Sequence, residues 1–239
     1  FLRAKRGNKM KSYLLFIGCF ISAFAFADGI SANSTRYIYP EGAHDITAWI
    51  NNESASPVFV QYWLDSGDSE TLPATPFELT PPVSRINPGA EQILRIRLTD
   101  KNSMPSDRES LWWLNVLDIP PVSETSSLKE KNSGQLAVRS RFKVFYRPAG
   151  LSDRNTASQR VSFQSGSHSI RVNNTSPYHI TITEITLADK KQILHKSFML
   201  QPKSSSEIAV KRAVKRGDHL TVSNINDQGG NVTFTATAE

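Results

Sequence analysis

Apolar and polar residues alternate in short runs along most of this chain, and turn-forming residues separate one run from the next. Alternation with a period of two is typical of β-strands with one buried face, whereas a helix needs apolar residues three and four positions apart. No helical pattern is visible after residue 28. The longest alternating run covers residues 135–148 and ends at Pro148, which cannot donate to a sheet. The pattern therefore predicts an all-β chain with a long strand that stops at Pro148.

The alternating runs fall into two sets. The first set lies at residues 35–39, 46–50, 58–64, 77–83, 92–98, 111–117 and 135–148. A second set of seven shorter runs lies between residues 160 and 236. Short strands in this number, without helices, match a two-sheet sandwich of immunoglobulin type. We therefore expect two immunoglobulin-like β-sandwich domains, residues 28–148 and 149–239.

The two sets differ in composition. The second set has more Thr and fewer aromatic residues, which predicts a smaller core. Five aromatic residues of the first set lie inside alternating strands, and we expect them to pack in the core and between the sheets rather than to stack on nucleic-acid bases. They are Trp49, Tyr62, Trp63, Trp112 and Trp113.

The N-terminal part of the chain predicts a secretory signal. Residues 12–26 contain no charge, and they end in Ala25-Phe26-Ala27, the pattern of a signal-peptidase site. We therefore assign residues 1–27 to upstream residues and a signal peptide. Reading residues 15–19 as a lipoprotein site that acylates Cys19 would leave the apolar residues 20–27 on the mature chain, and this disfavours that alternative.

Removal of residues 1–27 changes the charge and the cysteine content. The segment contains five basic residues and no acidic one, so the net charge falls from +6 to +1. The basic character of the whole chain is therefore no argument for nucleic-acid binding. Cys19 is the only cysteine, so residues 28–239 contain no disulfide and no thiolate metal site. We also expect no membrane insertion after the signal is cleaved.

The residues that would support catalysis do not form a recognisable group. The five histidines show no spacing typical of a metal site; they are His44, His168, His179, His195 and His219. The glycines fall in turns rather than in a loop that binds phosphate, and no nucleophile elbow is present. The sequence therefore predicts a protein that is not an enzyme and that needs no metal or other cofactor.

Several short motifs occur in an order that is similar to one known family. They are Thr35-Arg36, TPPVSR at residues 80–85, Pro88-Gly89, PSDRES at residues 105–110, Leu114-Asn115, IPP at residues 119–121, KVFYRP at residues 143–148, Ser176-Pro177-Tyr178 and INDQGG at residues 225–230. In their order and spacing, the chain resembles the periplasmic chaperones of the chaperone–usher pathway of pilus assembly. The resemblance covers essentially the whole chain after the signal.

The resemblance implies a fold and a mechanism. The family has two immunoglobulin-like domains set at an angle, with a cleft between them. A pilus subunit is an incomplete sandwich, and the chaperone completes it with a strand of its own before an outer-membrane usher receives the subunit. By position, the donor strand contains Leu136, Val138 and Ser140, with Leu136 and Val138 inserted into the subunit. The implied location is the periplasm, and the free protein could also associate with itself through the donor strand.

Charged residues at the motif positions have implied roles as well. Arg36 and Lys143 match the two cations that anchor the C-terminal carboxylate of the subunit. Glu109, Arg147 and Asp227 match an ionic network that joins the two domains. Without the resemblance, Arg36 and Lys143 would be read as solvated strand cations, and Glu109, Arg147 and Asp227 could each be an ordinary surface charge.

The chain departs from the family pattern before the donor strand. The loop at residues 122–134 is a few residues longer than in the short-loop branch, but the cysteine pair of the long-loop branch is missing, and this favours the short-loop branch. Two readings of the donor strand stay open: it is short, or Leu128 is drawn in when the loop orders. The isomer of the Pro81-Pro82 bond is also open. Two other functions compete with the chaperone reading, a secreted two-domain adhesin or lectin that binds glycans and a periplasmic hydrolase.

Overall fold

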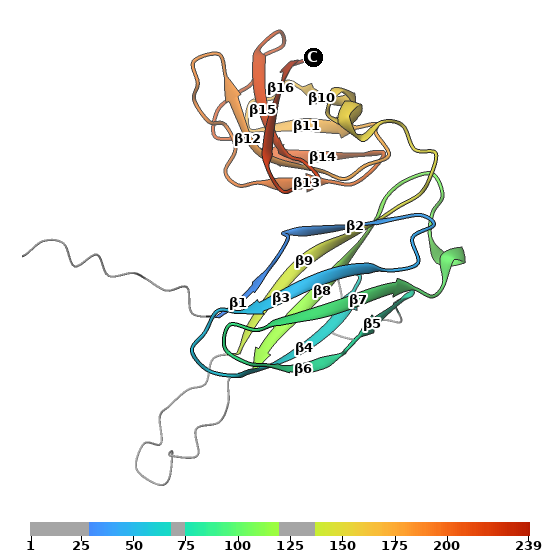
Figure 1. Cartoon of the computed structure of the whole chain (residues 1–239). Coiled ribbons are helices and arrows are strands. Elements are labelled where there is room, and N and C mark those ends of the chain that lie inside the picture. The colour runs from blue at the N-terminus through green and yellow to red at the C-terminus, as the bar shows by residue number, and fades with distance from the viewer. Residues whose placement is uncertain (1–28, 68–74, 120–136) are drawn as a thin grey trace, which may run out of the picture.

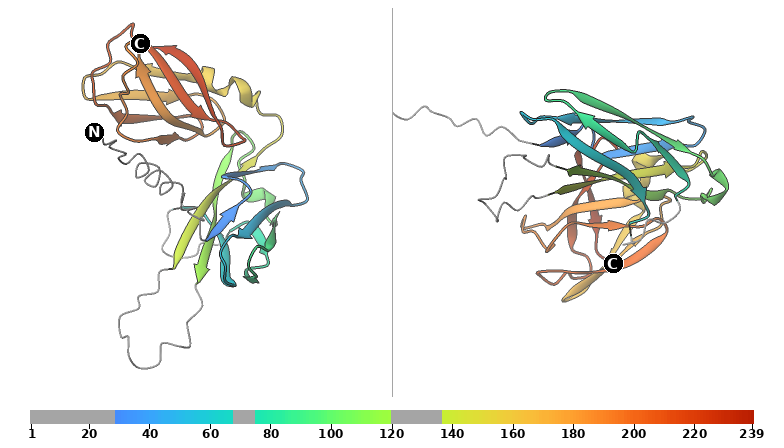
Figure 2. Two further views of the ribbon diagram at one scale, coloured as in Figure 1. Left: turned by 60° about the vertical axis from the view of Figure 1, so that its left-hand side comes forward. Right: turned by 90° about the horizontal axis from the view of Figure 1, so that it is seen from below.

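The computed structural model describes residues 29–67, 75–119 and 137–239. In these ranges the chain folds into two β-sandwiches set at an angle to each other (Figures 1 and 2). This confirms the prediction of an all-β chain with two immunoglobulin-like units. The predicted signal peptide, the loop at residues 122–134 and Leu136 lie outside the described residues.

The first sandwich consists of nine strands in two sheets. One sheet has the order β1-β3-β7-β5, and the other has the order β2-β9-β8-β4-β6. The strands are β1 (Ile30–Ala32), β2 (Arg36–Pro40), β3 (Ile46–Asn52), β4 (Val58–Asp65), β5 (Phe77–Thr80), β6 (Val83–Ile86), β7 (Glu91–Leu98), β8 (Ser110–Ile119) and β9 (Val138–Arg147).

The second sandwich contains seven strands, as the sequence predicts. Its sheets have the orders β10-β11-β14 and β13-β12-β15-β16. The strands are β10 (Val161–Gln164), β11 (Ser169–Asn174), β12 (Ile180–Leu187), β13 (Phe198–Leu200), β14 (Ser204–Ala209), β15 (His219–Ile225) and β16 (Asn231–Thr237).

Two strand predictions for the first sandwich are incomplete, because the chain crosses between sheets. The run at residues 35–39 corresponds to β2, which pairs with β9 in one sheet. The preceding strand β1 was not predicted, and it pairs with β3 in the other sheet. The run at residues 77–83 divides into β5 and β6 at Pro81 and Pro82, which have no N–H for a ladder. The Thr80–Pro81 bond is cis. It precedes the Pro81–Pro82 bond, whose isomer the sequence left open.

Two short 3-10 helices were not predicted, η1 (Lys101–Ser103) and η2 (Arg154–Arg160). Asp100 and Asp153 cap them, because each carboxylate accepts a hydrogen bond from the backbone amide two residues further on. Such short turns carry no helical periodicity, so only the capping residues signal them in the sequence. The helix η2 lies on the connection from β9 to β10, next to the second sandwich (Figure 1).

Each sandwich encloses its own core. The first is rich in tyrosine, and β9 contributes Val144 and Tyr146 to it. The second is mostly aliphatic, with Ile180, Ile182 and Ile185 fully buried. Within the described ranges the two cores contain similar numbers of buried residues, and more partly buried apolar residues pack against the first, so the smaller second core stays a prediction.

Candidate functional site

The first half of β9 has an open edge. On one side β9 pairs with β8 along its whole length, from Val138 opposite Asp118 to Tyr146 opposite Ser110. On the other side β2 pairs with it in parallel, but only at residues 143–147. Among the described residues, no strand pairs with residues 138–142 on that side. The backbone N–H and C=O groups there are available to another strand.

The side chains of β9 alternate between two environments. Val144 is buried in the core of the first sandwich, and Phe142 packs against that core. Further along the same face Ser140 is half-buried, and Val138 is 52% exposed. The inner face is therefore used by the chain's own core at the end of β9 and is free at its beginning. Leu136, the other predicted donor residue, lies outside the described residues.

Arg36 and Lys143 lie side by side where the open edge ends. They are direct partners in the parallel pairing of β2 with β9. Arg36 is only 8% exposed, and its Nε has no hydrogen-bond partner within the described part of the chain. The Lys143 ammonium lies 3.4 Å from the hydroxyl of Thr181, on β12 of the second sandwich. A buried cation, Arg36, and a half-buried one, Lys143, thus adjoin each other between the sandwiches.

The pKa values of both cations respond to this position. Burial lowers the pKa of Lys143, and the charge of Arg36 lowers it further. Burial also lowers the pKa of Arg36; the carboxylates of Asp227 and Glu109 partly offset this effect, and the charge of Arg154 adds to it. Both groups are therefore less stable as cations than in water. A carboxylate placed between them would reverse this penalty.

Arg147 brings the predicted ionic network together. Its guanidinium donates to Glu109 Oε1 at 2.7 and 2.9 Å. It also donates to the two oxygens of Asp227 at 2.6 and 3.1 Å. Glu109 precedes β8 and Arg147 ends β9, whereas Asp227 lies in the turn between β15 and β16. The three residues therefore connect the sandwiches, although their contribution to the domain arrangement stays a prediction.

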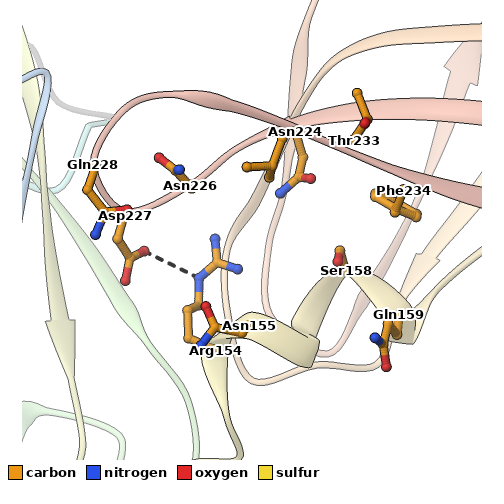
Figure 3. A pocket seen from close by; sticks show the side chains of 11 residues that line it. Arg154, Asn155, Ser158, Gln159, Asn224, Asn226, Asp227, Gln228, Thr233 and Phe234 are labelled. Atoms are coloured by element: carbon orange, nitrogen blue, oxygen red, sulfur yellow. Dashed lines mark ion pairs between the residues drawn. The ribbon is translucent and has the colours of Figure 1, made fainter.

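Sequence reasoning missed three further members of this network. The other oxygen of Glu109, Oε2, accepts a hydrogen bond from the backbone amide of His179 at 2.9 Å and lies 3.3 Å from its Nδ1. Arg154 Nε lies 3.4 Å from Asp227 Oδ1. Figure 3 marks this ion pair with a dashed line. The ring of Tyr178 lies near both guanidiniums, 5.1 Å from that of Arg147 and 5.4 Å from that of Arg154. Of these residues, only Tyr178 belongs to a motif that we singled out.

Gly229 allows the second sandwich to approach the first closely. It lies in the turn between β15 and β16 with a φ of +85°, a conformation that favours glycine. A Cβ at this position would lie 2.6 Å from the hydroxyl of Thr35, just before β2. The glycine of the INDQGG motif therefore permits a contact beside Arg36.

Two hollows adjoin these residues. One of about 430 Å³ lies between the sandwiches, with Glu109, Trp113 and Arg141 on one side and His179 and Met199 on the other. The second, of about 500 Å³, lies on the second sandwich beside Arg154 and Asp227 (Figure 3). Within the ranges that the structure describes, no group of His, Cys, Asp and Glu is arranged to hold a metal ion. In the same ranges, no helix has the length and apolar character needed to cross a membrane.

The prediction for the aromatic residues is only partly correct. Tyr62 is buried, and Trp112 packs on the core. Trp49 is exposed, however, and Trp63 and Trp113 lie on the outer face of their sheet, where Arg139 and Arg141 cover them. The alternation of β4 and β8 places these two rings opposite the buried face.

Comparisons with known proteins agree with this geometry. Residues 29–152 match the family "Pili and flagellar-assembly chaperone, PapD N-terminal domain", and residues 156–236 match "Pili assembly chaperone PapD, C-terminal domain". The sequence is 41% identical to the chaperone protein MrkB of Klebsiella pneumoniae, over 96% of this chain and 100% of that protein. It is 35% identical to the chaperone protein HifB of Haemophilus influenzae, over 96% of this chain and 97% of that protein.

Solved structures give the same result. The crystal structure of the YadV chaperone is similar with a TM-score of 0.74 and 33% identity, covering 87% of this chain and 98% of that one. The crystal structure of the Pseudomonas aeruginosa CupB2 chaperone is similar with a TM-score of 0.75 and 30% identity, covering 87% of this chain and 100% of that one.

Proposed function

Because the chain belongs to the family of pili-assembly chaperones, we propose that it binds a pilus subunit by donating the first half of β9 as an extra strand. The open edge at residues 138–142 supports this proposal, since added strands bind through free backbone groups. Val138 and Leu136 would enter the subunit, and Ser140 would lie between them and the anchor. This function is favoured over a glycan-binding adhesin, because the relatives and solved structures described above are chaperones.

The observation that carries the proposal is the pair of adjacent cations at the end of the open edge, of which Arg36 is buried and Lys143 half-buried. Within the described residues, the side chains of Arg36 and Lys143 have one hydrogen-bond partner between them, the Thr181 hydroxyl, and the Lys143 ammonium also lies 5.6 Å from the centre of the Trp113 ring. We propose that they bind the C-terminal carboxylate of the subunit through charge-assisted hydrogen bonds. The carboxylate would also fix the register of the added strand, because a slip of one residue would turn its side chains to the opposite face.

The anchor determines the direction of the added strand. β9 runs from residue 138 toward residue 147, and the cations lie at the far end of its open edge. A strand that lies along residues 138–142 and ends at these cations must run in the same direction as β9. It would be a parallel strand in line with β2, which pairs in parallel with the next five residues.

The energies indicate that the cations matter more than the apolar contacts. Removal of one partner of a buried charge pair weakens binding by about 2 to 5 kcal/mol. Complete burial of a valine or leucine gives about 1.5 to 3 kcal/mol, and Val138 is already half covered in the free chain. We therefore expect affinity to depend chiefly on Arg36 and Lys143.

The remaining parts of the proposal rest on the family alone. We propose that the protein acts in the periplasm, without catalysis or a cofactor, and passes the subunit to an outer-membrane usher. In the absence of a subunit, the open edge could pair with the edge of a second copy.

Co-expression with the subunit of its own pilus tests the proposal. Lys143→Met keeps the apolar stem of the side chain and removes the charge, and Arg36→Gln keeps hydrogen-bond donors without the charge. We expect each variant to remain soluble alone and to yield at least tenfold less soluble complex than the wild type.

Two exposed cations on the second sandwich provide matched controls, Lys211→Met and Arg171→Gln. They should give as much complex as the wild type. If Lys143→Met and Arg36→Gln also give wild-type yields, these residues do not anchor the subunit and the proposed function loses its main support.

A further inference from the structure

We propose that Asp65 is a positioning residue for the open edge of β9. It draws the side chains of Arg139 and Arg141 back across the sheet and so keeps residues 138–142 accessible to an incoming strand. This inference rests on the proposed function and adds to it a residue outside the anchor and outside the interdomain network.

The Asp65 carboxylate is buried and fully hydrogen-bonded. The residue ends β4 and is only 2% exposed. Oδ1 accepts from the Gly67 amide at 2.9 Å and from Arg141 at 2.8 Å. Oδ2 accepts from the Asn115 side chain at 2.7 Å and from Arg139 at 3.2 Å. Four donors occupy the hydrogen-bonding positions of one carboxylate, so its orientation is fixed.

The strand order shows the direction in which the two arginines extend. Asp65 lies on β4, which is separated from β9 by β8. Neighbouring strands lie about 4.8 Å apart, so the two arginines reach roughly 10 Å across the sheet toward Asp65. Their route leads away from the open edge, because that edge is on the opposite side of β9 from β8.

Further contacts hold each arginine along this route. Arg139 donates to Asn115 Oδ1 through two nitrogens, at 2.6 and 2.8 Å, and its guanidinium lies 5.0 Å from the ring of Trp63. The guanidinium of Arg141 lies 4.6 Å from the ring of Trp113. This arrangement explains why two tryptophans lie on the outer face of the sheet.

The consequence follows from how proteins protect strand edges. Charged side chains on an edge strand prevent pairing with other chains. Arg139 and Arg141 occupy alternate positions of the open segment, where free guanidiniums would provide such protection. Because Asp65 binds both, the edge keeps its cations and still admits a strand.

The first test measures where the guanidiniums lie and needs no partner. The Nη2 nitrogens of Arg139 and Arg141 donate to Asp65. In NMR spectra, we expect slowly exchanging Hη protons on these two nitrogens, and Asp65→Asn should make both exchange faster. Asp189→Asn removes a carboxylate that binds the exposed Arg212 at 2.8 Å, and it serves as the control. If the exchange of these Hη protons is unchanged in Asp65→Asn, Asp65 does not position the arginines and the proposal is wrong.

The second test measures access to the edge. The probe is a synthetic peptide of alternating Val and Thr with a free C-terminal carboxylate, in about 1 M salt, where the Debye length is about 3 Å and long-range attraction is screened. We expect Asp65→Asn to bind it about tenfold more weakly than the wild type. Addition of Arg139→Gln and Arg141→Gln to Asp65→Asn should restore wild-type affinity, because the freed guanidiniums are then absent.

The outcomes separate the two proposals. A merely structural role for Asp65 predicts no rescue by the arginine substitutions, and that result would overturn the inference. If the wild type binds the free-acid peptide no better than its C-terminal amide, the proposed anchor fails instead. The exchange of the arginine Hη protons then tests the position of the guanidiniums by itself.

Discussion

Removal of the Arg147 charge should destabilise the folded chain substantially. The guanidinium makes four hydrogen bonds to the carboxylates of Glu109 and Asp227. Arg147→Met keeps most of the apolar stem and deletes all four. Because the Glu109 side chain is only 2% exposed, it cannot regain water as a partner without local opening.

The structure limits the size of this effect. Loss of one partner from a buried ion pair destabilises a protein by about 3 to 5 kcal/mol. Asp227 keeps Arg154 at 3.4 Å and is a quarter exposed, and Glu109 keeps the backbone amide of His179. These remaining contacts place the expected loss near the lower limit, at about 3 kcal/mol.

Urea unfolding followed by far-ultraviolet circular dichroism measures this loss, because both sandwiches contribute to the signal. Arg212→Met is the matched control, since it removes an exposed arginine bound to Asp189 and should change stability by less than about 1 kcal/mol. The double variant Glu109→Gln, Arg147→Met should recover part of the loss. If Arg147→Met is no less stable than Arg212→Met, the network does not hold the sandwiches together.

Three further predictions follow from the region between the sandwiches. Burial alone would raise the pKa of Asp227, but the hydrogen bonds and charge of Arg147 outweigh burial and lower this pKa below its ordinary value. The ionised Asp227 therefore stabilises the fold at neutral pH, and this contribution disappears as the pH falls through the lowered pKa. Thermal unfolding of Asp227→Asn should accordingly depend less on pH below about 4 than that of the wild type. Gly229→Ala should lower stability by about 1 to 3 kcal/mol, because alanine is strained at positive φ and its Cβ meets Thr35; Thr35→Ala should relieve part of this loss in calorimetry. A bound carboxylate should raise the lowered pKa of Lys143, so complex formation at alkaline pH should take up protons, and calorimetry in buffers of different ionisation enthalpy should detect this uptake.

The sequence predicted the strands well because alternation is a local signal. All seven runs of the second set became strands, and the long run that ends at Pro148 became β9. The changes of sheet after β1 and after β5 were not predicted, since they depend on which distant strand supplies the hydrogen bonds. The division of the chain at residue 148 stays a prediction.

The site was predicted only where motifs carried it. The structure brings Arg36 next to Lys143 and brings Glu109, Arg147 and Asp227 together, although their roles are still to be tested. Asp65, Arg154 and His179 were missed, because each obtains its place from contacts with residues far away in the sequence. Asp65 contacts residues 74 and 76 positions further along the chain, and no local pattern contains this information.

Amide hydrogen exchange of β9 tests the central claim most directly. In the free protein, alternate amides of residues 138–142 should exchange rapidly, because they face the open edge, while those bonded to β8 should be protected. In the complex with a pilus subunit, the exposed amides should become protected as well. If the subunit binds and these amides exchange as before, β9 is not the strand that the subunit receives.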